Sequence, residues 1–286
     1  MNTLLSAPLV DTLLKDVTLR TGRLIDAGID PQLAVILIGN DPDSLKYISI
    51  KSKRAKEAGI IVSVYHMESG ISFEEVAEVI AFLAEDVDVH GIILQLPLPD
   101  YFTPEQTDQL LALVPSNKDV DGLRGEWSKQ KYQEPNMADL LLPRMALLPP
   151  MICSVVSLLE QYSISLRDKK VILVGAGRLV GAPLFTYLSS FDIDVQNVDE
   201  ETEGILDITS QADILISGTG QPDLITYQWV KPGAVVIDCA SDVHMDSVEQ
   251  VASAIAPSVG GVGPLTVAWL LHNCVQAASN QYPNLI

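Results

Sequence analysis

The sequence VILVGAGRLVGAP, residues 171–183, decides the fold of this chain. An apolar run of strand length comes first, then Gly175, Gly177 and Gly181, and then residues typical of a helix. Glycine permits the tight turn from strand to helix and lets the backbone approach a pyrophosphate, which the N–H groups at the helix N-terminus bind. A glycine pattern by itself is weak evidence, because structural turns use glycine as well.

The residues that follow this turn favour a dinucleotide site over a merely structural turn. A second strand is expected at residues 194–198, and Asp199 follows it directly, which is the context that a nicotinamide dinucleotide requires. Asp199 and Glu200 can accept hydrogen bonds from the ribose 2′-hydroxyl of NAD and would repel the 2′-phosphate of NADP, so the sequence favours NAD. Arg178, inside the glycine loop, either offsets part of this repulsion or faces solvent.

Apolar strands alternate with helical stretches along the whole chain, which is typical of a mostly parallel, buried sheet. In the first half, strands are expected at residues 33–39, 60–66 and 91–99, and helices at residues 43–58 and 72–85. In the second half, strands are expected at residues 169–175, 194–198, 212–218 and 234–240, and helices at residues 152–162 and 265–281.

The length and order of these elements predict an α/β fold of two domains with a cleft between them. At roughly 150 residues per domain, a chain of 286 residues is expected to form two. We expect a Rossmann-type NAD(P)-binding domain at residues 147–263 and an N-terminal α/β substrate domain that takes the rest of the chain.

The composition argues against several classes of partner. The net charge of −19 disfavours nucleic acid and anionic membranes, and no apolar run approaches the roughly 20 residues that span a bilayer. The N-terminus lacks the basic region and cleavage site of a signal peptide, so we expect a cytoplasmic protein. The three cysteines and four histidines are scattered, which predicts buried thiols and no metal site.

A second candidate site lies in the N-terminal half. Ser44, Tyr47 and Lys51 recur at helical spacing and share one helix face, although an ordinary solvated face could carry the same residues. Gln95 interrupts an otherwise apolar strand, and a buried amide needs polar partners, so we expect it to point into the cleft. Asp121 lies in a short acidic turn, KDVDG, where an edge of the cleft is expected.

Together these motifs resemble the methylenetetrahydrofolate dehydrogenase/cyclohydrolase family. They are SxxYxxxK (44–51), GIILQLPLP (91–99), KDVDG (118–122), GAGRLVGAP (175–183), KPGAVVID (231–238) and GGVGPLT (260–266), and they occur in the family's order. The resemblance implies oxidation of 5,10-methylenetetrahydrofolate with NAD(P) and hydrolysis of the methenyl product to 10-formyltetrahydrofolate. It also implies a homodimer, and a last helix, residues 264–286, that returns to the N-terminal domain of residues 1–146.

The resemblance implies a role for each residue of the second site. Lys51 is the proton-transfer group, Gln95 orients it, Tyr47 packs on the aromatic part of the folate, and Asp121 binds the pterin ring. A desolvated lysine has a depressed pKa and can shuttle a proton near neutral pH, and a carboxylate can accept two N–H bonds from an aminopyrimidine edge. The further substrate-binding residues implied are Ser44, Leu96, Pro97, Gly260, Gly261 and Pro264.

The chain departs from the family's pattern at the domain-joining edge of the cleft, and also at residues that bear on the nucleotide. Where the family has P-C-T-P-x-G before the first helix of its second domain, residues 149–154 read PPMICS. The family's Arg-Ser after the first glycine is Ala176-Gly177, and its small polar or basic residues after the second strand are Glu200 and Glu201. The second set of changes removes groups that would hold a 2′-phosphate, in agreement with the preference for NAD.

Three alternatives remain open from the sequence. One is another NAD(P)-dependent dehydrogenase on a similar plan, such as a shikimate-type enzyme, which would not require the set of Tyr47, Lys51, Gln95 and Asp121. Another is a non-catalytic folate-binding relative. The last is an enzyme that keeps only one of the two activities. Turnover with each folate substrate distinguishes these alternatives.

Overall fold

The computed structural model describes residues 2–142 and 146–283, which form two compact units. The six-stranded unit comprises residues 2–11, 131–142 and 150–266, and the three-stranded unit comprises residues 12–130, 146–149 and 267–283. Two helices, α1 (Ala7–Asp26) and α10 (Gly263–Gln281), begin in the six-stranded unit and continue into the three-stranded unit.

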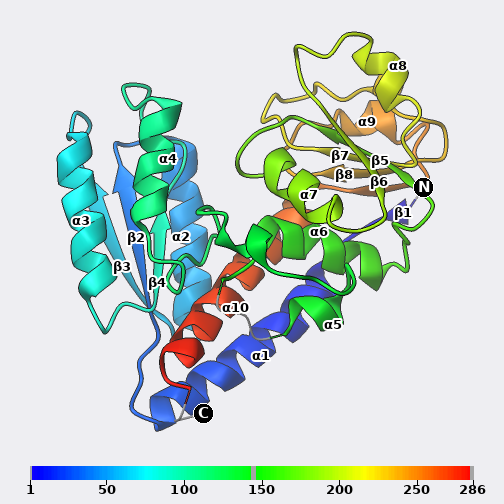
Figure 1. Ribbon diagram of the computed structural model, residues 1–286. Helices are drawn as coiled ribbons and strands as arrows, with labels where there is room; N and C mark the ends of the chain where they lie inside the picture. Colours follow the sequence, from blue (N-terminus) through cyan, green and yellow to red (C-terminus); the bar gives the residue numbers. More distant parts are fainter. Residues whose placement is uncertain (1, 143–145, 284–286) are drawn as a thin grey trace. The chain divides into compact units, whose positions relative to one another are not determined.

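The six-stranded unit is a parallel sheet in the order β1-β9-β8-β7-β5-β6 (Figure 1). Its strands are β1 (Asn2–Thr3), β5 (Lys170–Val174), β6 (Asp194–Val198), β7 (Ile214–Ser217), β8 (Val235–Asp238) and β9 (Ala254–Ala256). Its helices are α5 (Met137–Leu140), α6 (Pro150–Gln161), α7 (Gly181–Leu188), α8 (Ile205–Thr209) and α9 (Met245–Val248), with short helical turns η2 (Tyr227–Trp229) and η3 (Ser258–Val262). This is a Rossmann-like arrangement, in which ligands bind at the carboxyl ends of the strands.

Burial on both faces explains why the strands of this sheet are apolar throughout. Ile172 and Val174 of β5 belong to one hydrophobic core together with Leu215 of β7. Val171 and Leu173, which alternate with them, are buried as well, and α7 packs against β5 and β6. Successive side chains of a strand point to opposite faces, so a strand buried on both sides must be continuously apolar.

The three-stranded unit is a parallel sheet in the order β3-β2-β4. Its strands are β2 (Gln32–Ile38), β3 (Ile61–Met67) and β4 (Gly91–Leu94). Besides its parts of α1 and α10, its helices are α2 (Pro42–Glu57), α3 (Phe73–Glu85) and α4 (Pro104–Leu113), with the helical turn η1 (Glu126–Lys129). The α3 and α4 helices each begin with a capping box, at Ser72 and Thr103 respectively, which satisfies backbone N–H groups of the first turn.

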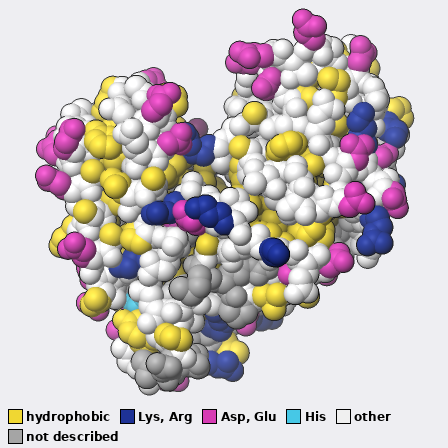
Figure 2. All heavy atoms as spheres, in the orientation of Figure 1, with side chains coloured by type: hydrophobic (Ala, Val, Ile, Leu, Met, Phe, Trp, Pro, Cys, Tyr) yellow, Lys and Arg dark blue, Asp and Glu magenta, His cyan; other side chains and the backbone are white. Residues whose placement is uncertain are grey.

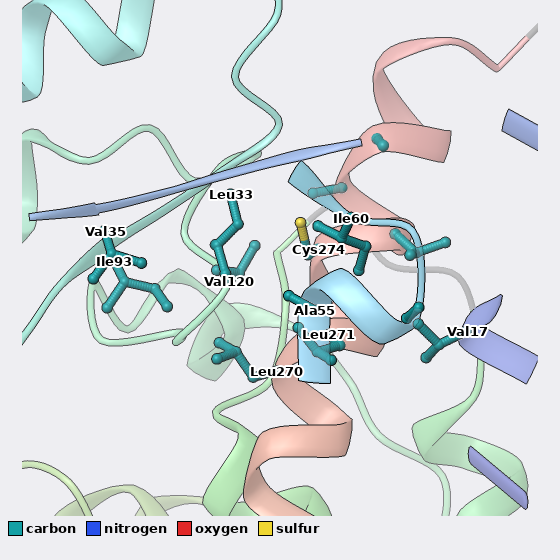
Figure 3. Packing of buried hydrophobic residues seen from close by; sticks show 14 of the residues in the cluster. Val17, Leu33, Val35, Ala55, Ile60, Ile93, Val120, Leu270, Leu271 and Cys274 are labelled. Carbon is teal, nitrogen blue, oxygen red and sulfur yellow. The ribbon is translucent and has the colours of Figure 1, made fainter. Parts of the chain in front are cut away.

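The central strand β2 divides the apolar residues of this unit into two cores. Leu33, Val35 and Leu37 face a core built with α1, α2 and α10 (Figure 3). The alternating residues of β2 face a second core built with α3 and α4. Figure 3 shows Leu270, Leu271 and Cys274 of α10 beside Ala55 of α2 in the first core, so α10 is part of this unit's interior.

One predicted strand is shorter than the sequence indicated. The apolar run at residues 91–99 predicts a single strand, but β4 ends at Leu94 and residues 95–99 leave the sheet. Pro97 and Pro99 lack the backbone N–H that a sheet ladder requires. The consequence is that Gln95 lies immediately after the strand rather than inside it.

A buried polar cluster joins α1 to α10 within the three-stranded unit. Arg20 of α1 donates to the Nε2 atom of His272 at 3.1 Å and to Gln276 at 2.8 Å. The ring of His272 also packs edge-on against Trp269. Burial, together with the positive charge of Arg20, lowers the pKa of His272 to about 3. His272 therefore stays neutral in the folded protein and accepts a hydrogen bond.

This neutral histidine is expected to make the protein less stable as the pH falls below about 6.5, the pKa of an unfolded histidine. Between that value and about 3 the unfolded chain binds a proton that folded His272 does not, so the free energy of unfolding decreases by at most about 1.4 kcal/mol per pH unit. Urea unfolding at pH 7.5 and 5.5 measures this decrease in the free energy of unfolding. In His272→Gln the loss between these two pH values should be smaller; an equal loss contradicts the assignment.

Acidic side chains outnumber basic ones on the surface. The chain has 37 Asp and Glu against 18 Lys and Arg, and Figure 2 shows the acidic side chains spread over the visible faces of both units. Within the residues that the structure describes, no helix combines the length and apolarity needed to cross a bilayer.

Candidate functional site

The helix α2 presents the first group of candidate residues. The carboxylate of Asp41 caps its N-terminus by accepting a hydrogen bond from the backbone N–H of Ser44 at 2.7 Å, which fixes where the helix begins. One and two turns further on, Tyr47 is half-buried and Lys51 is only 5 % exposed. A buried lysine needs polar partners, so the ordinary solvated face is the wrong interpretation for Lys51.

Lys51 and Gln95 form the centre of this site. The Nζ atom of Lys51 donates to Oε1 of Gln95 at 3.2 Å and lies 4.9 Å from the ring centroid of Tyr47. The amide nitrogen of Gln95 donates to the carbonyl of Leu96 at 2.7 Å. Because a lysine has no acceptor, this second bond fixes which end of the Gln95 amide faces Lys51.

The electrostatics of the site follow from burial and from one acid. Desolvation lowers the pKa of Lys51, and the negative charge of Asp121 opposes this shift in part. Desolvation, followed by the same charge of Asp121, raises the pKa of Tyr47 to about 12. The structure therefore brings Tyr47, Lys51 and Gln95 together, with Asp121 close enough for its charge to act on Tyr47 and Lys51.

The turn KDVDG that carries Asp121 is held by its own neighbouring residues. Lys118 donates to the carbonyls of Leu83 and Ala84, near the end of α3, and to that of Asp86, which directly follows the helix, at 2.6–3.2 Å. The backbone N–H of Ile92 donates to the carbonyl of Lys118 at 2.8 Å, which ties the turn to β4. Lys118 is thus a cap for a helix C-terminus, where a cation is favoured.

Asp119 and Asn273 complete this support, and the sequence analysis assigned a role to neither. Asp119 is buried and accepts hydrogen bonds from the backbone N–H groups of residues 123 and 124 at 3.2 and 2.9 Å. Burial raises its pKa to about 7 in spite of these bonds. Asn273 of α10 donates to the carbonyls of Val120 and Leu148 at 2.9 and 2.8 Å. An amide inside an apolar helix was the signal that could have identified Asn273.

The other predicted substrate-binding residues are divided between the two units. Leu96 and Pro97 follow Gln95 in the three-stranded unit, joined by a cis peptide bond. Gly260, Gly261 and Pro264 belong to the six-stranded unit, where the carbonyl of Gly260 accepts hydrogen bonds from the backbone N–H and the hydroxyl of Ser6.

The glycine turn of the six-stranded unit has the geometry that the sequence predicted. Gly175 directly follows β5 and has φ +99°, a conformation that residues with a side chain rarely adopt. A Cβ atom at Gly181, the first residue of α7, would overlap the carbonyl of Gly175. A Cβ atom at Gly177 would meet no protein atom within 4 Å. Packing within the protein therefore explains Gly175 and Gly181, whereas no contact within the protein requires a glycine at Gly177.

The acids after β6 are exposed and held in a turn. Oδ1 of Asp199 accepts hydrogen bonds from the hydroxyl of Thr202 at 2.9 Å and the backbone N–H of Glu201 at 3.2 Å. Glu200 is also exposed, and Arg178 is half-buried in the glycine turn. Asp199 and Glu200 follow the carboxyl end of β6, which pairs directly with β5.

A buried acid supports the neighbouring loop at the same edge of the sheet. Asp242 is fully buried and binds the loop of residues 217–220 that follows β7. Asp242 was not predicted from the sequence, because an acid in a stretch of mixed composition has no periodic pattern that marks it.

Comparisons with known proteins address the family directly. Residues 4–121 match the model for the catalytic domain of tetrahydrofolate dehydrogenase/cyclohydrolase, and residues 149–282 match the model for its NAD(P)-binding domain. The bifunctional protein FolD of Nautilia profundicola is 36% identical over 96% of this chain and 95% of its own length. The chain belongs to this family.

Solved structures of the family agree with this assignment. The bifunctional FolD enzyme of Campylobacter jejuni has a TM-score of 0.85 at 33% identity and covers 98% of this chain and 99% of its own. The enzyme of Trypanosoma brucei, described as complexed with NADP and an inhibitor, has a TM-score of 0.85 at 26% identity, with 97% of each chain covered. Family membership decides against the shikimate-type alternative and confirms an α/β chain with a catalytic and an NAD(P)-binding domain.

Proposed function

We propose that this member of the family oxidises 5,10-methylenetetrahydrofolate with NAD(P) and hydrolyses the methenyl product to 10-formyltetrahydrofolate, with Lys51 as the proton-transfer group. The single observation that carries the proposal is the buried Nζ of Lys51, held by Gln95 above Tyr47, inside the region matched by the family's catalytic domain. The negative charge of Asp121 also acts on Lys51, which places this carboxylate close to the same site.

The hydrolysis follows from the lowered pKa of Lys51. Burial increases the neutral fraction of this amine near pH 7, so it can accept a proton from the water that attacks the methenyl carbon. When the bond from that carbon to the ring nitrogen N5 breaks, N5 takes the bonding electron pair and the proton that the ammonium returns. The hydroxyl of the intermediate releases its own proton to solvent and becomes the carbonyl of the formyl group, which remains on N10. Gln95 holds Nζ in one position through both transfers.

The remaining residues of the site bind and orient the folate. The Asp121 carboxylate accepts N–H bonds from the aminopyrimidine edge of the pterin, and the ring of Tyr47 packs on the aromatic part of the substrate. The other proposed substrate-binding residues are supported by the sequence motifs that contain them. These residues are Ser44, Leu96, Pro97, Gly260, Gly261 and Pro264.

The residues at the carboxyl end of β5 fit a nicotinamide dinucleotide. The space beside Gly177 and the N-terminus of α7 suit a pyrophosphate, which Gly175 and Gly181 shape by allowing the tight turn. NAD(P), when bound, supplies the hydride acceptor of the oxidation. We propose NAD rather than NADP, because Asp199 and Glu200 are exposed acids directly after β6, the strand beside the glycine turn, and their negative charge would repel a 2′-phosphate.

Replacing Asp199 by alanine is expected to raise the Michaelis constant for NAD by about ten- to a hundredfold, the loss of about one hydrogen bond to a charged group. The constant for NADP should fall, because repulsion of the 2′-phosphate decreases. The matched control is Asp194→Ala, which removes an exposed acid at the amino end of the same strand. Unchanged constants in Asp199→Ala would count against a ribose contact.

The proposed function is tested by the absorbance change when purified protein is mixed with methylenetetrahydrofolate and either NAD or NADP. Turnover with NAD and little with NADP is the expected result. Turnover mainly with NADP would keep the enzyme and overturn the proposed cofactor preference. Absence of turnover with both, together with hydrolysis of methenyltetrahydrofolate, would leave a cyclohydrolase alone, and absence of both activities would favour a non-catalytic folate-binding protein.

We further propose a cytoplasmic homodimer built on the six-stranded unit, as the resemblance to the family implies. The three cysteines, all within the described part of the chain, are buried, which suits a reducing compartment. Analytical ultracentrifugation of the purified chain measures the oligomeric state, and a single species near 31.0 kDa would contradict the dimer.

A further inference from the structure

We infer that Asp242 is a positioning residue for nucleotide binding, because it fixes the loop of residues 217–220 against the glycine turn. Asp242 itself is 0% exposed, so it does not reach a bound nucleotide. The inference rests on the proposed use of NAD(P) in the six-stranded unit, and it adds to that proposal a residue that acts through the backbone of a neighbouring loop.

The carboxylate of Asp242 binds successive groups of the loop. Oδ2 accepts hydrogen bonds from the hydroxyl of Ser217 at 2.5 Å and from the backbone N–H of Thr219 at 2.7 Å. Oδ1 accepts a hydrogen bond from the backbone N–H of Gly220 at 2.8 Å. Bonds of this kind to an ionised acceptor are about twice as strong as neutral ones, and here they fix the end of β7 and the loop that follows it.

Asp242 is itself anchored to the two neighbouring parts of the sheet. Its backbone N–H donates to Oδ1 of Asp238, at the end of β8, at 3.0 Å. Its carbonyl accepts a hydrogen bond from the N–H of Ile225 at 3.0 Å. Hydrogen bonds of its backbone therefore hold Asp242 in place, and its carboxylate connects the carboxyl ends of β7 and β8.

The loop that Asp242 holds is in direct contact with the glycine turn. The N–H of Gly218 donates to the carbonyl of Val174 at 3.0 Å. A Cβ atom at Gly218 would overlap the side chain of Val180, the N-cap residue of α7. A Cβ atom at Gly175 would lie 3.1 Å from the carbonyl oxygen of Gly218 and from Thr219. There is no spare space between loop and turn, so a shift of the loop moves the surface that would receive the dinucleotide.

Only a carboxylate meets the requirements of this position. An asparagine side chain in its place would offer one acceptor oxygen and would direct an NH₂ group at a donor of the loop. An alanine would leave the N–H groups of Thr219 and Gly220 without their acceptor at a buried place. Both changes displace the loop, and displacement by about 1 Å can cost roughly a hundredfold in a positioned interaction.

The test uses the two activities of the full chain as separate measurements. In Asp242→Asn and Asp242→Ala the dissociation constant for the dinucleotide that the wild-type chain binds better, measured by fluorescence titration, should rise about ten- to a hundredfold. The rate of methenyltetrahydrofolate hydrolysis, which needs no dinucleotide, should stay within about twofold of wild type. A general loss of structure would lower both, so this split distinguishes positioning from stability.

The matched control is Asp213→Ala. Asp213 is a carboxylate at the opposite end of β7, where it accepts hydrogen bonds from the N–H of Lys170 at 3.0 Å and from Lys231 at 2.7 Å. This variant should bind the dinucleotide as the wild type does. If Asp242→Asn retains hydrolysis and also retains wild-type dinucleotide affinity, the inference is wrong. If the wild-type chain hydrolyses methenyltetrahydrofolate but binds neither NAD nor NADP, the proposed cofactor is wrong and the inference falls with it.

Discussion

Replacing Lys51 by methionine is expected to lower the rate of methenyltetrahydrofolate hydrolysis by about 10²- to 10⁴-fold, the usual contribution of a general acid–base group. Methionine fills a similar volume and suits a buried position, so the fold should be retained. The pKa of Lys51 is lowered by burial, so wild-type activity should rise as the pH increases through that pKa, and the variant should lose this dependence. Initial rates over a range of pH measure both effects.

Two further variants distinguish the proton-transfer role of Lys51 from the effect of its positive charge and from a general effect of substitution in α2. Lys51→Arg keeps a positive charge but does not give up its proton near neutral pH, so it should be nearly as inactive as Lys51→Met. Lys53→Met removes an exposed cation two residues along the same helix and should hydrolyse the substrate normally. Wild-type production of 10-formyltetrahydrofolate by Lys51→Met would remove Lys51 from the mechanism.

Replacing Gly181 by alanine is expected to abolish binding of the dinucleotide, with a rise in the dissociation constant of about a hundredfold or more. The new methyl group would overlap the carbonyl of Gly175, which is backbone and can be relieved only by moving the turn. Overpacking of this kind costs typically about 1–3 kcal/mol of stability. Titration with NAD and NADP measures binding, and thermal unfolding measures the cost in stability. Normal affinity in this variant would show that the turn does not hold the pyrophosphate.

Gly177→Ala is the matched comparison, because its methyl group meets no protein atom within 4 Å. Its stability should stay within about 0.5 kcal/mol of wild type, as for most surface substitutions. Its affinity for the dinucleotide should nevertheless fall, since the methyl group takes space that a pyrophosphate needs. Loss of binding without loss of stability would separate the ligand's requirement for glycine from the protein's own requirement.

Much of the fold follows from local sequence patterns. Every strand and helix that the sequence indicated is present, and β6 agrees at both ends. The patterns did not indicate β1, of two residues, or β9, of three, because such short runs carry no detectable periodicity. The prediction of one strand at residues 91–99 failed because apolar composition was given more weight than the two prolines.

In the candidate site, too, local sequence patterns identify some residues and not others. Residues that recur at helical spacing, such as Tyr47 and Lys51, could be found from the sequence. The contact of Lys51 with Gln95 could be expected from the need of a buried amide for partners. Asn273 and Asp242 bind backbone groups that are far away in the sequence. The amide of Asn273 inside an apolar helix is a local signal, but no local pattern marks Asp242 or identifies the partners of either residue. Their contribution becomes visible only when the loops they hold are placed in three dimensions. The roles of the individual site residues stay predictions.

The division of α10 between the two units has a consequence for the order in which the chain folds during synthesis. Leu270, Leu271 and Cys274 are fully buried in the core that β2 and α2 begin. The ribosome makes these residues only after the whole six-stranded unit, which ends at residue 266. The three-stranded unit, most of which is translated first, therefore completes its core last. Until then its apolar face is exposed, and nascent chains that stop before residue 267 contain a finished sheet in one unit and an open core in the other.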